Sequence, residues 1–169
     1  MSSVCELIRH NDRGDFWPDR NFLEHLKEWD KTHPNEPIYG PIVKHTWKVD
    51  DKDYERLNPR HDSLHELPDA SGFLLCEKLE RSDNLVLLDA YGKERMRLSM
   101  PWQLTRHPTP KSAKYPSHFL GLTTPLDNPQ TGEQGKFAVL AWVEYAGDYA
   151  FELDWQVGQF KWGYFLERG

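Results

Sequence analysis

The sequence has little cysteine, no long apolar run and no leader of the secretory type. Its 2 cysteines, Cys5 and Cys76, are too few for a disulfide scaffold, and we expect both to be free thiols. The uncharged run over residues 117–126 is too short to cross a bilayer. The first residues lack the basic region and apolar core of a secretion signal. We therefore expect a cytoplasmic protein that does not bind membranes.

Positively charged residues are fewer than negatively charged ones. The chain carries 21 Lys and Arg against 27 Asp and Glu, so its formal net charge is 21 − 27 = −6. A protein that holds nucleic acid neutralises many phosphates with Lys and Arg, so direct nucleic-acid binding is not expected. Large apolar side chains are abundant, with 7 Trp, 7 Tyr and 8 Phe, which excludes a disordered chain. The length fits a single domain over residues 1–169.

One segment near the N-terminus has helical periodicity. Its apolar residues Phe22, Leu23, Leu26 and Trp29 fall at i, i+1, i+4 and i+7. This spacing predicts an amphipathic helix at about residues 19–31. The apolar side of such a helix needs a partner, and we expect it to pack on a sheet.

The body of the chain, residues 38–166, is rich in strand signals. Residues 43–49 alternate apolar and polar side chains, which predicts a strand with His45 on its apolar face. The charged segment 50–68 predicts a short helical turn and a surface loop. After it, residues 73–76 resume a strand.

A hairpin is the next predicted element. Residues 85–90 and 94–100 flank a turn at residues 91–93. A three-residue loop in this place pairs Asp89 with Arg95 on the polar face, which supports the register.

A Pro-rich connection follows over residues 101–135. Its six prolines leave room for one short strand at His118–Leu122. A connection of this length is more often functional or wrapped on the surface than idle. The sequence leaves open whether it is an ordered binding loop or a mobile link.

The last part of the chain predicts a three-stranded meander with turns at residues 146–148 and 157–158. The predicted register collects apolar side chains on one face: Val139, Ala141, Val143, Tyr145, Tyr149, Phe151, Leu153, Trp155, Phe160, Trp162, Tyr164 and Leu166. On the other face it sets Trp142 opposite Glu152, and it places Phe165 on the same side.

Together these elements predict a mainly β (α+β) fold. We expect an antiparallel β-barrel or sandwich of hairpins and a meander, with one N-terminal amphipathic helix on a face or end.

Histidine provides the nearest approach to a metal motif. His61 and His65 are four residues apart, a spacing that lets two imidazoles bind one zinc ion from one helical face. Asp62 stands where the zincin signature has Glu, and Pro68 disfavours a helix here, so a solvated loop is the preferred interpretation. His45 is either a satisfied core residue or a catalytic group with a perturbed pKa. We expect no cofactor and predict no catalytic residue.

Two surfaces are candidates for binding. Basic side chains on the outer side of the hairpin indicate either a solvated sheet face or an anion-binding patch; they are Lys93, Arg95, Arg97 and Arg106. The outer face of the meander combines aromatic and acidic side chains, as an interface hot spot and its rim do. The predicted partner-binding residues are Trp142, Glu144, Glu152, Asp154 and Phe165. The alternative is that the N-terminal helix covers Trp142.

The leading hypothesis is an intracellular, non-enzymatic protein-binding module. We predict an acidic protein of the inhibitor or immunity type that docks on a basic macromolecular partner. Two alternatives stay open. One is a barrel or sandwich that binds a small molecule or carbohydrate, and the other is a metal hydrolase that uses His45, His61 and His65.

Overall fold

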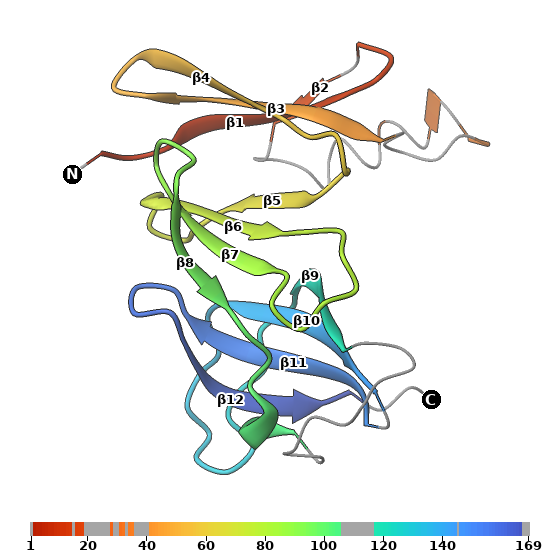
Figure 1. Ribbon diagram of the computed structural model, residues 1–169, viewed down its shortest axis with the longest axis vertical. Helices are drawn as coiled ribbons and strands as arrows, with labels where there is room; N and C mark the ends of the chain where they lie inside the picture. The colour runs from red at the N-terminus through yellow and green to blue at the C-terminus, as the bar shows by residue number, and fades with distance from the viewer. Residues whose placement is uncertain are drawn as a thin grey trace. The chain divides into compact units, whose positions relative to one another are not determined.

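The computed structural model describes most of the chain. The described residues are 2–14, 16–18, 28, 31–32, 34–35, 41–105, 117–144 and 146–166. They form twelve strands, which lie in three four-stranded antiparallel sheets (Figure 1). The predicted mainly β, antiparallel character is therefore confirmed.

The first sheet has the strand order β2-β1-β3-β4. Its strands are β1 (Cys5–Asn11), β2 (Phe16–Pro18), β3 (Ile42–Val49) and β4 (Lys52–Leu57). β3 shows the predicted alternation, because every second side chain from His45 to Val49 is buried. The loop and helical turn predicted over 50–68 are wrong, since Asp50 and Asp51 adopt positive φ angles of 50° and 64° and turn the chain into β4. Alternating charges suit an exposed edge strand of this kind.

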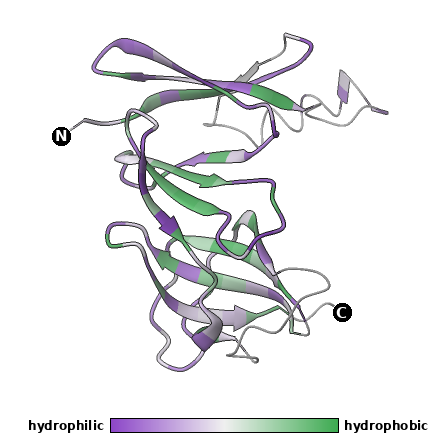
Figure 2. Ribbon diagram, in the orientation of Figure 1, coloured by the Kyte–Doolittle hydropathy of each residue, from purple (hydrophilic) through white to green (hydrophobic). Residues whose placement is uncertain are grey.

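The second sheet has the strand order β5-β6-β7-β8. Its strands are β5 (Ser63–Glu66), β6 (Gly72–Cys76), β7 (Leu85–Asp89) and β8 (Glu94–Leu98). β6 and β7 are almost wholly buried, and Figure 2 shows both as hydrophobic. Asp89 does not pair with Arg95 as predicted. Its carboxylate accepts the backbone N–H groups of Tyr91 (2.9 Å) and Lys93 (3.0 Å), whereas Arg95 donates to the carbonyl of Trp155.

The third sheet has the strand order β12-β11-β10-β9. Its strands are β9 (His118–Thr123), β10 (Ala138–Val143), β11 (Gly147–Asp154) and β12 (Gln159–Phe165), and the 3-10 helix η1 (Trp102–Leu104) precedes them. β9 lies where the sequence predicts a strand in the Pro-rich connection. One face of the sheet forms an aromatic core, in which Phe119 stacks on Phe160 and Phe151 meets Phe160 edge-on, with ring centroids 5.6 and 5.8 Å apart.

The chain divides into two compact units. One consists of Met1–Leu75 and Leu88–Lys93, and it contains the first sheet. The other consists of Cys76–Leu87 and Glu94–Gly169, and it contains the third sheet. The single domain expected over residues 1–169 stays a prediction.

Two parts of the predicted architecture do not hold. The amphipathic helix expected at about 19–31 lies almost wholly outside the described residues, which include only Glu28 and Lys31 of that range, and the structure gives it no support. A closed barrel is not formed by the described residues, because each of their sheets is open and ends in two edge strands. No helix in the described part of the chain is long and apolar enough to cross a membrane.

Candidate functional site

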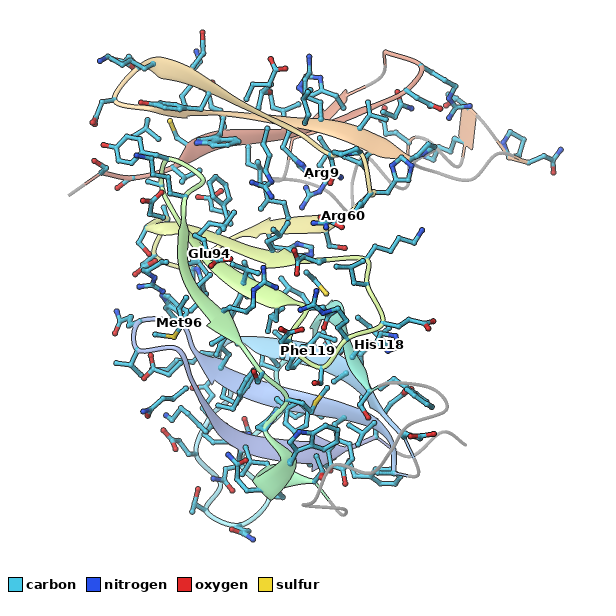
Figure 3. All side chains as sticks on the ribbon, in the orientation of Figure 1. Arg9, Arg60, Glu94, Met96, His118 and Phe119 are labelled. Atoms are coloured by element: carbon cyan, nitrogen blue, oxygen red, sulfur yellow. The ribbon has the colours of Figure 1, made fainter. Side chains whose placement is uncertain are left out.

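Three neighbouring strands of the third sheet carry one row of side chains. Trp142 on β10 pairs with His118 on β9 and with Asp148 on β11. Directly paired residues project on the same side of a sheet, so these three side chains share one face. The His118 and Trp142 ring centroids are 6.0 Å apart, and Figure 3 labels His118 on β9.

The same face continues onto β12. Tyr164 pairs with Ala150, which lies two residues beyond Asp148 on β11, so Tyr164 projects on the side of Trp142. Tyr164 is 38% exposed, while Trp142 and His118 are half-buried. We call His118, Trp142, Asp148 and Tyr164 the Trp142 face. Its partly open aromatic rings with polar neighbours have the composition of an interface hot spot.

The predicted register of β10 against β11 is wrong. Trp142 does not lie opposite Glu152, because the turn between the strands lies two residues earlier than predicted and Val143 pairs with Gly147. Glu152 therefore pairs with Ala138, at the other end of β10. A register is fixed by the turn that starts it, so a turn at an earlier position displaces every pair of the hairpin.

Glu152 is a buried residue of the fold and does not lie at an exposed rim. It is 5% exposed, and its Oε2 accepts the backbone N–H groups of Lys136 (2.9 Å) and Phe137 (3.1 Å). Its Oε1 is buried and has no hydrogen-bond partner among the described residues. Glu152 thus fastens the segment before β10 to β11.

Phe165 lies on the opposite face of the sheet from Trp142. It pairs with Tyr149, and their ring centroids are 5.5 Å apart in an edge-on arrangement. Tyr149 lies next to Asp148 on β11, and successive residues of a strand point to opposite faces. The structure therefore separates the two aromatic residues that the sequence placed in one surface.

A bulge in β12 explains this separation, because the longer turn before it shifts the register by two residues and leaves the faces unchanged. Asp154 pairs with Gln159, so the turn holds residues 155–158 instead of the two residues predicted. The carboxylate of Asp154 accepts two backbone N–H groups of this turn, at 3.1 and 3.4 Å. A bulge at Lys161 then adds one residue to β12. Such an insertion reverses the face of every residue beyond it, including Phe165.

The five predicted partner-binding residues thus have different places. Trp142 is half-buried on the Trp142 face, and Glu144 follows two residues later, with its backbone N–H donating to the hydroxyl of Ser117 at 2.9 Å. Asp154 holds a turn, and both acids are half-buried. The structure brings Trp142 together with His118, Asp148 and Tyr164 instead. No local pattern indicated these three residues, because their common face depends on turn lengths and a bulge.

Acidic charge is concentrated in the part of the chain that forms this sheet. Residues 117–166 contain six Asp and Glu, two Lys and no Arg, so they carry 2 − 6 = −4 of the net charge of −6. Asp127 and Glu133 are exposed members of this set. Residues 117–166 therefore carry net negative charge, which attracts positively charged surfaces.

The basic side chains of the β7–β8 hairpin are engaged within the fold. The guanidinium of Arg97 donates to Glu77 at 2.5 Å and to Glu94 at 3.2 Å, and the hydrogen bond with Glu77 raises the pKa of Arg97. Arg95 donates to a backbone carbonyl, and Arg106 lies outside the described residues. These contacts favour internal pairing over anion binding.

The candidate metal ligands do not converge. The described residues contain no group of three or more His, Cys, Asp or Glu that could hold a metal ion. His61 Nδ1 lies 3.3 Å from the carbonyl oxygen of Ile42, and His65 Nδ1 lies 3.4 Å from Arg9 Nη2. His65 belongs to β5, so the shared helical face considered for the two histidines does not exist.

His45 is a buried, neutral histidine of β3. It is 2% exposed, and the register places it between Arg9 of β1 and Arg56 of β4. Burial, then the charges of Arg9 and Arg56, and then those of His65 and His10 lower the pKa of His45 to about 3. Its Nδ1 has no hydrogen-bond partner among the described residues. An imidazole in this position contributes packing and stays uncharged at neutral pH.

Comparisons with known proteins add one finding. No protein-family model matches the chain, and a search of curated proteins finds no match either. Among solved structures, the chain is similar to a chain of the "Structure of Tne2 in complex with Tni2", with a TM-score of 0.69 and 11% sequence identity. The alignment covers 97% of this chain and 99% of that chain. The two chains therefore share a fold over nearly their whole length.

Proposed function

We propose that this chain is an intracellular protein-binding module of the inhibitor or immunity type. The observation that carries the proposal is the fold likeness, over 97% of the chain, to a chain from a complex of Tne2 with Tni2. The similar chain, which shares this arrangement of strands over nearly its whole length, belongs to a complex of two proteins. The acidic composition of this chain agrees with a basic partner.

The Trp142 face is the surface proposed for the partner. Trp142 and Tyr164 offer large rings held on a rigid sheet, and such rings lose little conformational entropy when they bind. Glu144 and Asp154 supply carboxylates in the same unit. Together with the net charge of −4 over residues 117–166, they favour a partner whose contact surface is basic.

Replacement of Trp142 tests this surface. We expect Trp142→Ala to weaken partner binding by about 2 kcal/mol, because Trp anchors dominate interfaces. The tagged chain and the variant are used side by side to capture proteins from a lysate of the source organism, and the retained proteins are quantified by mass spectrometry. A single protein held at one copy per chain by the wild type, and lost with Trp142→Ala, is the expected result.

Phe165→Ala is the matched control, since Phe165 lies on the opposite face of the same sheet. We expect it to retain the partner. Equal retention by the wild type and Trp142→Ala would remove the Trp142 face from the interface, and recovery of no stoichiometric partner by the wild type would contradict the proposed function.

Salt dependence tests the charge of the partner. Because residues 117–166, which form the third sheet, carry a net charge of −4, their association with a basic surface is steered by long-range attraction that ions screen. An increase of ionic strength by about tenfold should lower the association rate constant by roughly tenfold or more and change the dissociation rate little. Surface plasmon resonance with the captured partner measures both constants. An association rate that is independent of salt would exclude a basic contact surface.

A further inference from the structure

The segment between β9 and β10 is an exposed loop with a fixed conformation. Residues 124–137 contain no strand or helix, and residues 129–134 at its tip are all exposed. We call residues 124–137 the braced loop. It includes the last part of the Pro-rich connection at residues 101–135, for which the sequence left order and function open.

Bonds within the loop fix its tip. The side-chain oxygen of Asn128 accepts the N–H groups of Gln130 (2.9 Å) and Thr131 (3.3 Å). The backbone N–H of Asn128 donates to the carbonyl of Glu133 at 2.8 Å, and the N–H of Gly132 donates back to the carbonyl of Asn128 at 2.9 Å. These bonds close a compact turn at the exposed end.

Three side chains of the third sheet hold the loop in place. The indole N–H of Trp162 donates to the carbonyl of Leu126 at 3.1 Å, and Lys161 donates to the carboxylate of Glu133 at 2.7 Å. Glu152 accepts two backbone N–H groups at the end of the loop. Trp162 and Glu152 are 6% and 5% exposed, so two of the three anchors are groups buried in the fold.

This bracing is costly for a loop that buries so little at its tip. Ordering exposed residues costs conformational entropy, and burying a carboxylate costs desolvation, here with one oxygen left without a partner. The anchors fix the shape of a polar tip, and we infer that this shape offsets the entropy and desolvation costs when the loop binds a partner. A fixed shape strengthens binding, because the ordering is complete before the partner arrives.

We propose that the braced loop is a second contact element, which enters a neutral polar cleft of the same partner protein that binds the Trp142 face. The inference rests on the proposed function. Gln130 and Gln134 carry exposed amide groups that make no hydrogen bond with the described residues, and amides are complementary to peptide groups and neutral polar side chains. Lys161 neutralises Glu133 at the tip, so the loop itself presents little net charge to the cleft.

A double variant of the tip tests the proposal. Gln130→Ala/Gln134→Ala removes both amides and leaves every anchor in place. The probe is the purified protein that the wild-type chain retains in the capture experiment, and its affinity is measured by titration calorimetry. We expect the double variant to bind about tenfold more weakly, with an unchanged melting temperature. Gln156→Ala, an exposed glutamine in the β11–β12 turn of the same unit, should bind as the wild type does.

A variant of one anchor separates shape from contact. Lys161→Met frees Glu133 and leaves the tip sequence unchanged, so we expect weaker partner binding together with faster hydrogen exchange of the loop amides. Affinity of the tip double variant within about twofold of the wild type would overturn the loop's role, while Trp142-dependent binding would still support the proposed function. If the wild type itself has no partner, the proposed function fails and the loop's role fails with it.

Discussion

Asn84→Ala should destabilise the protein by about 3 kcal/mol, one of the two largest effects expected here. Asn84 is fully buried and comes immediately before β7. Its side chain hydrogen-bonds backbone groups that a neighbouring strand would otherwise pair. Its oxygen accepts the N–H of Phe119 at 2.8 Å, and its amide donates to the carbonyls of Phe119 and Glu77, both at 2.9 Å. Alanine leaves the N–H of Phe119 and the carbonyl of Glu77 buried without these partners.

Urea denaturation followed by Trp fluorescence measures this loss. Gln103→Ala provides the comparison, because Gln103 is exposed in η1 and its replacement should change stability by less than about 0.5 kcal/mol. If Asn84→Ala unfolds at the same urea concentration as the wild type, the connection between β7 and β9 through this side chain is not a significant source of stability.

Acid should destabilise the wild type more steeply than a variant without His45. The pKa of His45 is about 3 in the folded protein, against 6.5 for an unperturbed histidine. Between these values the unfolded chain binds a proton that the folded chain does not, so stability falls as the pH drops below 6.5 and the loss ends near pH 3. The slope is about 1.4 kcal/mol per pH unit, which gives roughly 3 kcal/mol between neutral pH and about pH 4.

His45→Phe removes this titration and keeps a buried ring in β3. Unfolding free energies of both proteins, measured by urea denaturation across this pH range, should differ in slope by about one proton. Comparison with His61→Asn controls for histidine in general, since His61 is exposed and asparagine tolerates its φ of 59°. Parallel pH profiles for the wild type and His45→Phe would show that His45 is not held neutral by its position between Arg9 and Arg56.

Local patterns predicted eight of the twelve strands that the described residues form. The alternation from His45 to Val49, the β7–β8 hairpin and the short strand at His118 all appear in the structure. Strands β1, β2, β4 and β5 were not predicted, and β4 resembles a loop in sequence because most of its side chains are charged and the residues on either side of it are polar. An exposed edge strand such as β4 needs no apolar face toward solvent, so its sequence carries only a weak signal for a strand.

Register was the part that sequence reasoning could not supply. The predicted partner surface depended on which residues lie opposite each other, and this is set by the position of the turn before β11, a four-residue turn after Asp154 and a bulge at Lys161. Each of these changes a pairing by a small number of residues, and a change of one residue moves Phe165 from one face to the other. The burial of Glu152 was equally hidden, because its partners are backbone N–H groups of a distant loop.

The mass of the chain, isolated gently from its own cells through a tag that is then cleaved off, tests the central claim most directly. Native mass spectrometry of the eluted protein should show one principal species, which exceeds the 19.9 kDa of the chain by the mass of a single basic partner. The same preparation of Trp142→Ala should contain mainly the free chain. A wild-type chain that elutes at 19.9 kDa alone, or only as multiples of that mass, would contradict the account of a module that works by binding another protein.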